Sequence, residues 1–239
     1  MTYSKSDDIY ETILNRICLR QYRPGTVLRE EDMASEFGVS RTLIRQALQR
    51  LQLEGMIESR KRLGTMVTGF SRETTKEMYD IRVHLTDLAG VESHRTYTQE
   101  DITAMEALMD RIRTMQKSGD MEEYWAINLD LLHILTRVIE NRTLRNLMQM
   151  LFYQTARNWA FLYTKMWDEA CELLIEELGL EISFMKGGDR RGVFLTMKSF
   201  IVRCLQACEK TFENLSEDDR GFNSNANHSF DFRGIAIRE

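Results

Sequence analysis

The feature that most constrains the fold is a pair of short amphipathic helices separated by a three-residue turn. Residues 31–37 predict the first helix and residues 41–51 the second. The turn is Gly38-Val39-Ser40, in which a glycine suited to a left-handed helix end precedes a serine suited to an N-cap. The apolar side of the second helix consists of Leu43, Ala47, Leu48 and Leu51. Its other sides are polar and basic, so the sequence predicts a helix-turn-helix whose second helix can enter a DNA groove.

A basic β-hairpin is predicted directly after the second helix. Two short strands, 56–59 and 65–68, flank the turn Arg60-Lys61-Arg62-Leu63-Gly64. Three cations beside a glycine form a wing suited to phosphates or to the minor groove. A run of cations alone would more often be an ordinary solvated surface. Because turn chemistry, helical spacing and hairpin coincide, we favour a winged helix-turn-helix.

Many residues at the start of the chain agree in order and spacing with a known motif. The agreeing segments are 23–34, 37–42, 45–48, Leu51, 54–55 and 64–65. On these segments the chain resembles the winged helix-turn-helix of the GntR family of bacterial transcription regulators. We therefore expect a homodimer whose two recognition helices read a short inverted repeat in double-stranded DNA.

The predicted DNA contacts divide by chemistry. Arg41 and Arg45 are expected at base edges, where a guanidinium can bind guanine bidentately. Ser40 and Thr42 are expected at phosphates. The wing contributes Lys61 and Arg62, and the family resemblance adds Arg29 near the DNA backbone and Gly64 at the wing tip.

After residue 70 the chain contains no proline, and its apolar residues recur at helical spacing. Six helices are predicted, over 73–97, 100–118, 121–139, 142–166, 168–186 and 189–212. The predicted fold is thus mostly α, with a winged helix-turn-helix domain at 1–70 and an all-α six-helix bundle at 71–212. Residues 213–239 lack periodicity and are expected to form a mobile tail.

Four segments of the second domain carry a further resemblance. They are residues 78–82, 124–129, 140–144 and 188–189. They are similar to the FadR-type branch of the GntR family, whose carboxy-terminal effector domain is called FCD. The resemblance implies that residues 71–212 bind a small-molecule effector and hold the dimer together. Six helices rather than seven favour the VanR-like subgroup.

Many FCD domains hold a divalent metal with one Asp or Asn and three His, and this chain departs from that pattern. Asn128 falls at the first ligand position, but the histidine positions fall at Leu132 and near Leu178 and Phe200. Aliphatic and phenyl groups cannot ligate a metal. We therefore expect no metal cofactor.

An alternative metal site in a shifted register stays open. It would use Asp130 and His133, three residues apart on one helix, and recruit His84 or His94. A single histidine in a helical bundle is more often a structural residue. This alternative therefore ranks below a domain without metal.

Without a metal, a ligand pocket needs polar anchors among apolar walls. Arg82 matches an arginine of the first FCD helix and could bind a carboxylate bidentately, and Asn128 could orient the same ligand. Arg157 and Asn158 are further candidate anchors within an aromatic stretch. We expect the effector to be a small anionic metabolite.

Composition and missing motifs exclude several classes. A net charge of −5, 43% hydrophobic residues and the lack of any long apolar run fit a cytoplasmic protein with no membrane partner. The chain has no P-loop, no GxGxxG and no GxSxG, so we expect no enzyme. The alternative to a DNA-binding regulator is a protein-interaction adaptor that uses the winged helix structurally.

Overall fold

A computed structural model describes residues 5–61, 63–69, 71–162 and 166–213 of the chain. Its first part is a winged helix-turn-helix made of α1 (Lys5–Cys18), α2 (Glu30–Phe37), α3 (Arg41–Leu53), β1 (Ile57–Arg60) and β2 (Gly64–Val67). The predicted wing residue Arg62 and most of the predicted tail lie outside the described residues.

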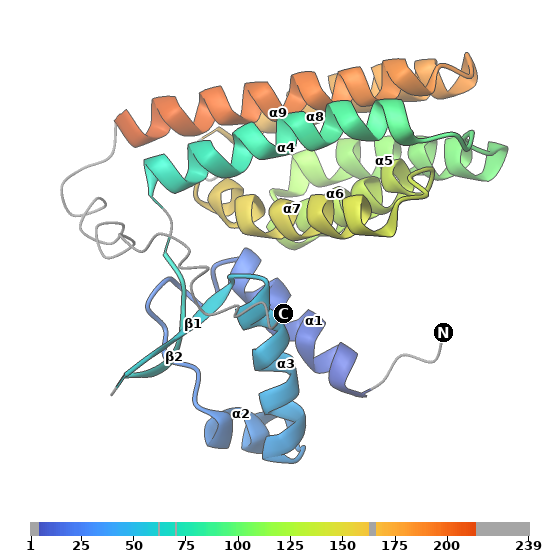
Figure 1. Ribbon diagram of the computed structural model, residues 1–239. Helices are drawn as coiled ribbons and strands as arrows, with labels where there is room; N and C mark the ends of the chain where they lie inside the picture. The colour runs from blue at the N-terminus through green and yellow to red at the C-terminus, as the bar shows by residue number, and fades with distance from the viewer. Residues whose placement is uncertain (1–4, 62, 70, 163–165, 214–239) are drawn as a thin grey trace.

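The second part is a layered bundle of long helices. They are α4 (Arg72–Glu92), α5 (Gln99–Ser118), α6 (Met121–Thr136), α7 (Arg142–Leu162), α8 (Trp167–Lys186) and α9 (Arg190–Glu213). Figure 1 shows α4 and α9 side by side along the outer layer, with α6 and α7 in the layer nearer the winged part. The predicted fold class, a winged helix followed by a helical bundle, is confirmed. Among the described residues no helix is both long and apolar enough to cross a bilayer.

The winged part is held together by the buried faces of α1 and α3, which pack against each other. Ile44 of α3 is completely buried and Leu43 only partly, so the apolar side of this helix is rotated slightly from the predicted one. The two strands pair antiparallel, with Ile57 opposite Val67 and Arg60 opposite Gly64. Both strands sit within one residue of their predicted positions.

Local capping explains most helix boundaries in the bundle. Thr98 caps α5, since its hydroxyl accepts from the Asp101 N–H and the Asp101 carboxylate accepts from the Thr98 N–H. Asp189 accepts from the Gly192 N–H at the start of α9, and Gly188 takes the left-handed conformation with φ 69°. These caps fix the turns between helices.

The predicted helix over 73–97 is too long at its carboxyl end. The helix stops at Glu92, because Ser93 takes an extended conformation with φ −79° and ψ 132°. The segment that follows is held by tertiary contacts: Ser93 is buried, and the Tyr97 hydroxyl donates to the Leu135 carbonyl at 2.9 Å. Neither contact leaves a local sequence signal.

Candidate DNA-binding surface and ligand cavity

The turn between α2 and α3 has the predicted backbone geometry. Gly38 ends α2 in the left-handed conformation, with φ 61° and ψ 39°. Ser40 occupies the N-cap position of α3, but its side chain makes no capping hydrogen bond. The backbone carbonyl of Ser40 instead accepts from Leu43 and Ile44. Its exposed hydroxyl is therefore not used by the helix it precedes.

The amino-terminal half of α3 presents its polar side chains to solvent. Arg41, Thr42 and Arg45 are all exposed, whereas Ile44 and Ala47 on the opposite side are buried. This division matches the expectation for a helix that packs by one side and contacts a partner by the other.

The two exposed arginines share an acidic neighbour that the sequence reasoning missed. Arg45 donates through Nε and Nη2 to the two carboxylate oxygens of Glu30, at 2.9 and 2.7 Å. The Arg41 Nη2 lies 3.9 Å from the same carboxylate. These hydrogen bonds from Arg45 lower the pKa of Glu30. The acidic start of α2, next to the recognition helix, was the available signal.

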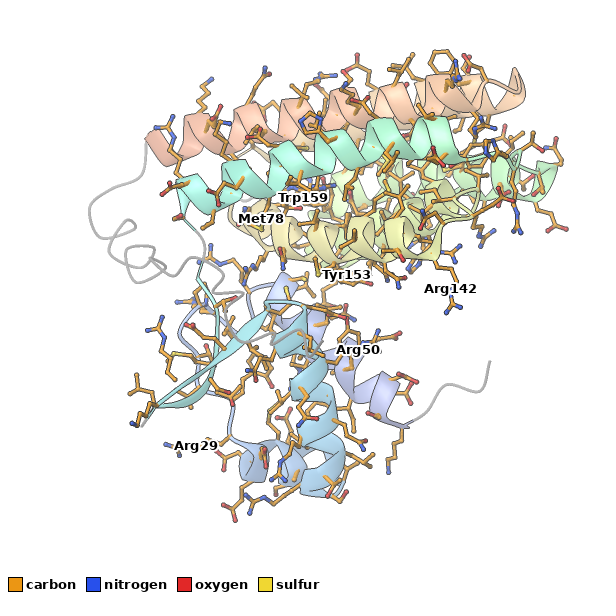
Figure 2. The ribbon with its side chains drawn as sticks, in the orientation of Figure 1. Arg29, Arg50, Met78, Arg142, Tyr153 and Trp159 are labelled. Atoms are coloured by element: carbon orange, nitrogen blue, oxygen red, sulfur yellow. The ribbon has the colours of Figure 1, made fainter. Side chains whose placement is uncertain are left out.

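The other predicted DNA contacts within the described residues are also at the surface. Lys61 and Gly64 are exposed in the wing, and Gly64 has φ 92°, which favours glycine. Arg29 is exposed in extended backbone directly before α2. Figure 2 shows it beside α2, in the half of the winged part farther from the bundle. The neighbouring wing cation Arg60 is paired with Glu58 at 2.7 Å.

A mostly apolar cavity lies inside the bundle, between α4, α6, α7, α8 and α9. Its walls include Leu132, Trp159 and Phe200, and its polar lining residues are Arg82, Asn128 and Glu177. The volume open to the centre of a water molecule is about 20 Å³, enough for about one water. A larger ligand would require the lining side chains to move.

Arg82 and Asn128, both predicted anchors, are brought together at this cavity. Arg82 is 5% exposed, and its Nη1 donates to Thr155 Oγ1 at 2.7 Å. Its guanidinium carbon lies 5.8 Å from the ring centroid of Trp159. Asn128 donates through Nδ2 to the Tyr124 carbonyl at 2.8 Å. The cavity therefore has a cationic side chain and an amide side chain among its lining residues.

The predicted anchors Arg157 and Asn158 are not among the residues that line this cavity. Arg157 donates through Nη1 to Thr68, at 3.0 Å from the carbonyl and 2.7 Å from the hydroxyl. Asn158 donates to Thr75 Oγ1 at 3.2 Å. The rotation of α7 directs Trp159 to the cavity and turns Arg157 toward the winged part.

The buried Arg157 belongs to a set of contacts that join α6 and α7 to the winged part. Gln154 donates to the Glu54 carbonyl at 2.6 Å, and Trp125 of α6 donates to Asn15 Oδ1 at 2.8 Å. Figure 2 places Tyr153 at this junction and Trp159 further toward α4. Burial lowers the pKa of Arg157 to about 10. One side of α7 thus lines the cavity while the next side contacts the winged part.

Glu177 is the cavity residue that sequence reasoning missed. It is 5% exposed, and Glu181, one turn later on α8, is completely buried. Burial raises the pKa of both carboxyls, and Glu181 raises that of Glu177 further. The available signal was a pair of glutamates in the same helical phase as the core residues Leu174 and Leu178.

The residues do not fit the family's metal site. Leu132 and Phe200 line the cavity beside Asn128, where the family pattern has histidines. The alternative metal ligands, Asp130 and His133, do not line the cavity. Asp130 accepts from Arg111 at 2.6 Å, and His133 is exposed. Within the described part of the chain, no three His, Cys, Asp or Glu side chains are grouped to hold a metal ion.

The architecture defines a winged helix-turn-helix protein with a carboxy-terminal helical bundle. Two family models match it: the gntR family of bacterial regulatory proteins over residues 5–67, and the FCD domain over residues 77–178. Together they cover well over half of the chain. The protein belongs to the GntR family and carries an FCD domain.

Individual relatives agree with this assignment. The uncharacterized HTH-type transcriptional regulator YdhC of Bacillus subtilis is 27% identical over 141 residues, which are 59% of this chain and 63% of that protein. The gluconate operon transcriptional repressor of Bacillus licheniformis is 31% identical over 100 residues, 42% of this chain and 41% of that protein. The chain thus matches less than two thirds of the length of either relative.

Solved structures share the fold at lower identity. McbR/YncC of E. coli superposes with a TM-score of 0.77 at 21% identity, covering 88% of this chain and 100% of that one. A GntR-type putative regulator from Rhodococcus sp. RHA1 gives 0.69 at 16% identity, covering 87% and 99%. At these identities the likeness concerns the fold alone.

Proposed function

We propose that this protein is a transcription regulator that binds operator DNA through α3 and the wing and responds to a small ligand in the bundle. The observation that carries the DNA half is the exposure of Arg41, Thr42 and Arg45 on a helix whose other side is fully packed. The functional units are residues 1–70 and 71–212. Because its partner is DNA, the protein acts in the cytoplasm.

The bound form is a homodimer on a short inverted repeat. An exposed apolar stripe on α4 supports this, formed by Ile81, Leu88 and Val91 with exposures of 51, 43 and 57%. Positions seven and three residues apart lie on one side of a helix, and exposed apolar side chains are favourable to bury against a second copy. Two copies related by a two-fold axis would present two recognition helices to symmetric half-sites.

Selection of binding sequences from random duplexes tests the DNA half. The full chain should enrich an inverted repeat, and the Arg41→Ala, Arg45→Ala double variant should not. The matched control is Arg113→Ala, which removes an exposed arginine of α5 far along the chain. If wild type enriches no motif, the DNA-binding proposal fails and the adaptor alternative gains support.

The ligand half rests on Arg82 and Asn128 at one cavity. A buried guanidinium beside an amide suits a small organic acid held by charge-assisted hydrogen bonds. A relative named for the gluconate operon is compatible with an acidic effector. The arrangement of α4 to α9 in six helices supports placement in the VanR-like subgroup.

A thermal-shift screen of organic acids tests the ligand half. At about 100 times its Kd, a ligand should stabilise wild type by roughly 2.7 kcal/mol. The stabilisation should disappear in Arg82→Met and persist in Arg113→Met. Stabilisation of both variants equally would contradict the assignment of Arg82 as the anchor.

A further inference from the structure

One helix of the bundle, α7, holds both elements that are proposed to read DNA. Gln154 of α7 donates to the carbonyl of Glu54, the residue that ends α3, at 2.6 Å. Arg157, one turn later on α7, donates through Nη1 to the carbonyl and the hydroxyl of Thr68, which directly follows β2. The end of the recognition helix and the end of the wing are thus attached to the same side of α7.

Thr68 also ties these two ends to each other. Its hydroxyl donates toward the Gly55 and Met56 carbonyls, at 2.8 and 3.0 Å. Gly55 and Met56 lie in the turn that links α3 to β1, and Gly55 takes the left-handed conformation with φ 71°. The contact that Arg157 makes with Thr68 therefore acts on the wing and on the end of α3 together.

A further contact joins α6 to the first helix of the winged part. Trp125 donates through its indole N–H to Asn15 Oδ1 of α1 at 2.8 Å. Its ring stacks on Phe152 of α7, with 5.7 Å between the ring centroids and 21° between the planes. The winged part is therefore held through α1, through the end of α3 and through the end of β2. Contacts to three elements oppose rotation about any one of them.

The chemistry of Arg157 suits it to fixing an orientation. The side chain is buried, and besides Thr68 its Nε donates to the Gln154 carbonyl at 3.2 Å. A guanidinium carries its N–H groups in a rigid planar fork, so partners bound to different nitrogens are held in one relative geometry. Burial excludes the water that would otherwise compete for these hydrogen bonds.

We propose that Arg157, Gln154 and Trp125 are positioning residues that set the spacing between the two half-sites of the operator. This inference rests on the proposed homodimer on an inverted repeat. In a dimer joined through its bundles, the separation and relative rotation of the two recognition helices follow from how each winged part is attached to its bundle. A winged part on a flexible tether would instead accept many spacings.

The geometry of DNA makes spacing a sensitive measure of this attachment. Each added base pair moves one half-site by about 3.4 Å along the axis and rotates it by about 35°, because a turn contains about 10–10.5 base pairs. A fixed junction cannot follow both changes and keep its contacts at Glu54 and Thr68. Wild type should therefore bind one spacer length at least about tenfold more tightly than lengths one base pair shorter or longer.

The test is fluorescence anisotropy of the full chain with duplexes that carry the enriched half-sites at varied spacing. In Arg157→Met the preference for one spacing should fall below about threefold. Affinity for a duplex with a single half-site should change by less than about twofold, because α3 and the wing keep their own side chains. A variant that had only lost structure would lose affinity for both kinds of duplex.

The matched control is Arg145→Met. Arg145 lies on the same helix and donates to the Ile139 carbonyl at 3.3 Å, a contact within the bundle. This variant should keep the wild-type spacing preference.

A second variant removes the other contacts and keeps Arg157. The Trp125→Phe, Gln154→Met double variant loses the donors to Asn15 and Glu54 and keeps an aromatic ring against Phe152. It should also lower the spacing preference. Circular dichroism checks that each variant is folded, and this variant decides the question if Arg157→Met does not fold.

The possible failures are distinguishable. If wild type enriches no inverted repeat, the proposed function fails and this inference fails with it. If wild type binds an inverted repeat but accepts neighbouring spacings equally, the role of the junction is overturned while the DNA-binding proposal stands. The same conclusion follows if the folded variants keep the tenfold preference. A loss of single half-site affinity as large as the loss at the preferred spacing would show that these residues act in folding and not in positioning.

Discussion

The winged part and the bundle use the same side chain, arginine, in opposite ways. Arg45 on α3 is 55% exposed and forms an ion pair with a carboxylate that is itself accessible. Arg157 and Arg82 in the bundle are 4% and 5% exposed and are hydrogen-bonded to hydroxyls and carbonyls.

This difference indicates which arginines can exchange partners. An exposed ion pair contributes little to stability and can be replaced by phosphates or bases. A buried guanidinium loses its hydration, so it must keep its internal hydrogen bonds or gain a ligand. The exposed arginines are therefore suited to binding DNA. Arg157 is suited to joining the winged part to the bundle, and Arg82 is suited to binding a ligand inside the protein.

The largest effect is expected from Arg157→Met. The variant keeps the side-chain volume but leaves the Thr68 carbonyl and the Gln154 carbonyl without their donor. We expect the free energy of unfolding to fall by about 2 kcal/mol, measured by urea denaturation. Arg113→Met, which removes an exposed ion pair with Asp110, should change it by less than about 0.5 kcal/mol. Equal effects of the two changes would contradict the distinction between buried and exposed arginines.

The next effect concerns DNA rather than stability. Arg45→Ala should weaken binding to the enriched duplex by roughly tenfold or more, because a bidentate base contact is lost. Arg50→Ala is the matched control on the same helix, since Arg50 faces α1 and lies 3.6 Å from the Tyr10 ring centroid. Fluorescence anisotropy measures both. A larger loss of affinity in Arg50→Ala would place the DNA on another side of α3.

The buried carboxyls give a pH-dependent prediction. Because the folded-state pKa of Glu181 is raised by burial, the protein should lose stability as pH rises above the ordinary glutamate range toward that raised value. Glu181→Gln should remove part of this loss. The stability of the variant relative to wild type should therefore increase as pH rises from 4.5 to 8. Thermal unfolding across this pH range measures the gap, which is the difference in Tm between the variant and wild type. A gap that stays constant would show that Glu181 is ionised in the folded protein.

The smallest effect is expected in the wing. Lys61→Ala should weaken binding to all duplexes by a similar factor and reduce the slope of log K against log salt by about 1, as for one phosphate contact. Lys76→Ala in α4, where Lys76 pairs with Asp80, is the control and should leave the slope unchanged. A sequence-dependent loss in Lys61→Ala would instead indicate a base contact.

The sequence specified the elements whose signals are local. Gly38, Thr98 and Asp189 mark helix ends through their own backbone and side-chain chemistry, and the structure places these residues at those ends. The stop at Ser93 has no such signal, because it depends on contacts between segments distant in the chain. Boundaries set by local chemistry were therefore more predictable than boundaries set by packing.

The residues of the candidate site show the same difference between local signals and packing. Arg82 was predicted from its matched position and does line the cavity, whereas Arg157 was chosen only for its residue type and its aromatic neighbours. Whether a residue of α7 faces the cavity or the winged part depends on the rotation of the whole helix. Glu177 was missed because a charged residue is usually exposed, although its position in the apolar phase of α8 was a signal of the burial that the structure shows.

The most direct test of the central claim is the affinity of the full chain for the enriched duplex and for a shuffled duplex at one salt concentration. Specific regulators bind their sites about a thousandfold or more tightly than other DNA. We predict a ratio of this order for wild type, with most of it lost in the Arg41→Ala, Arg45→Ala double variant. Equal affinity of wild type for the two duplexes would contradict the assignment of α3 as a DNA-reading helix.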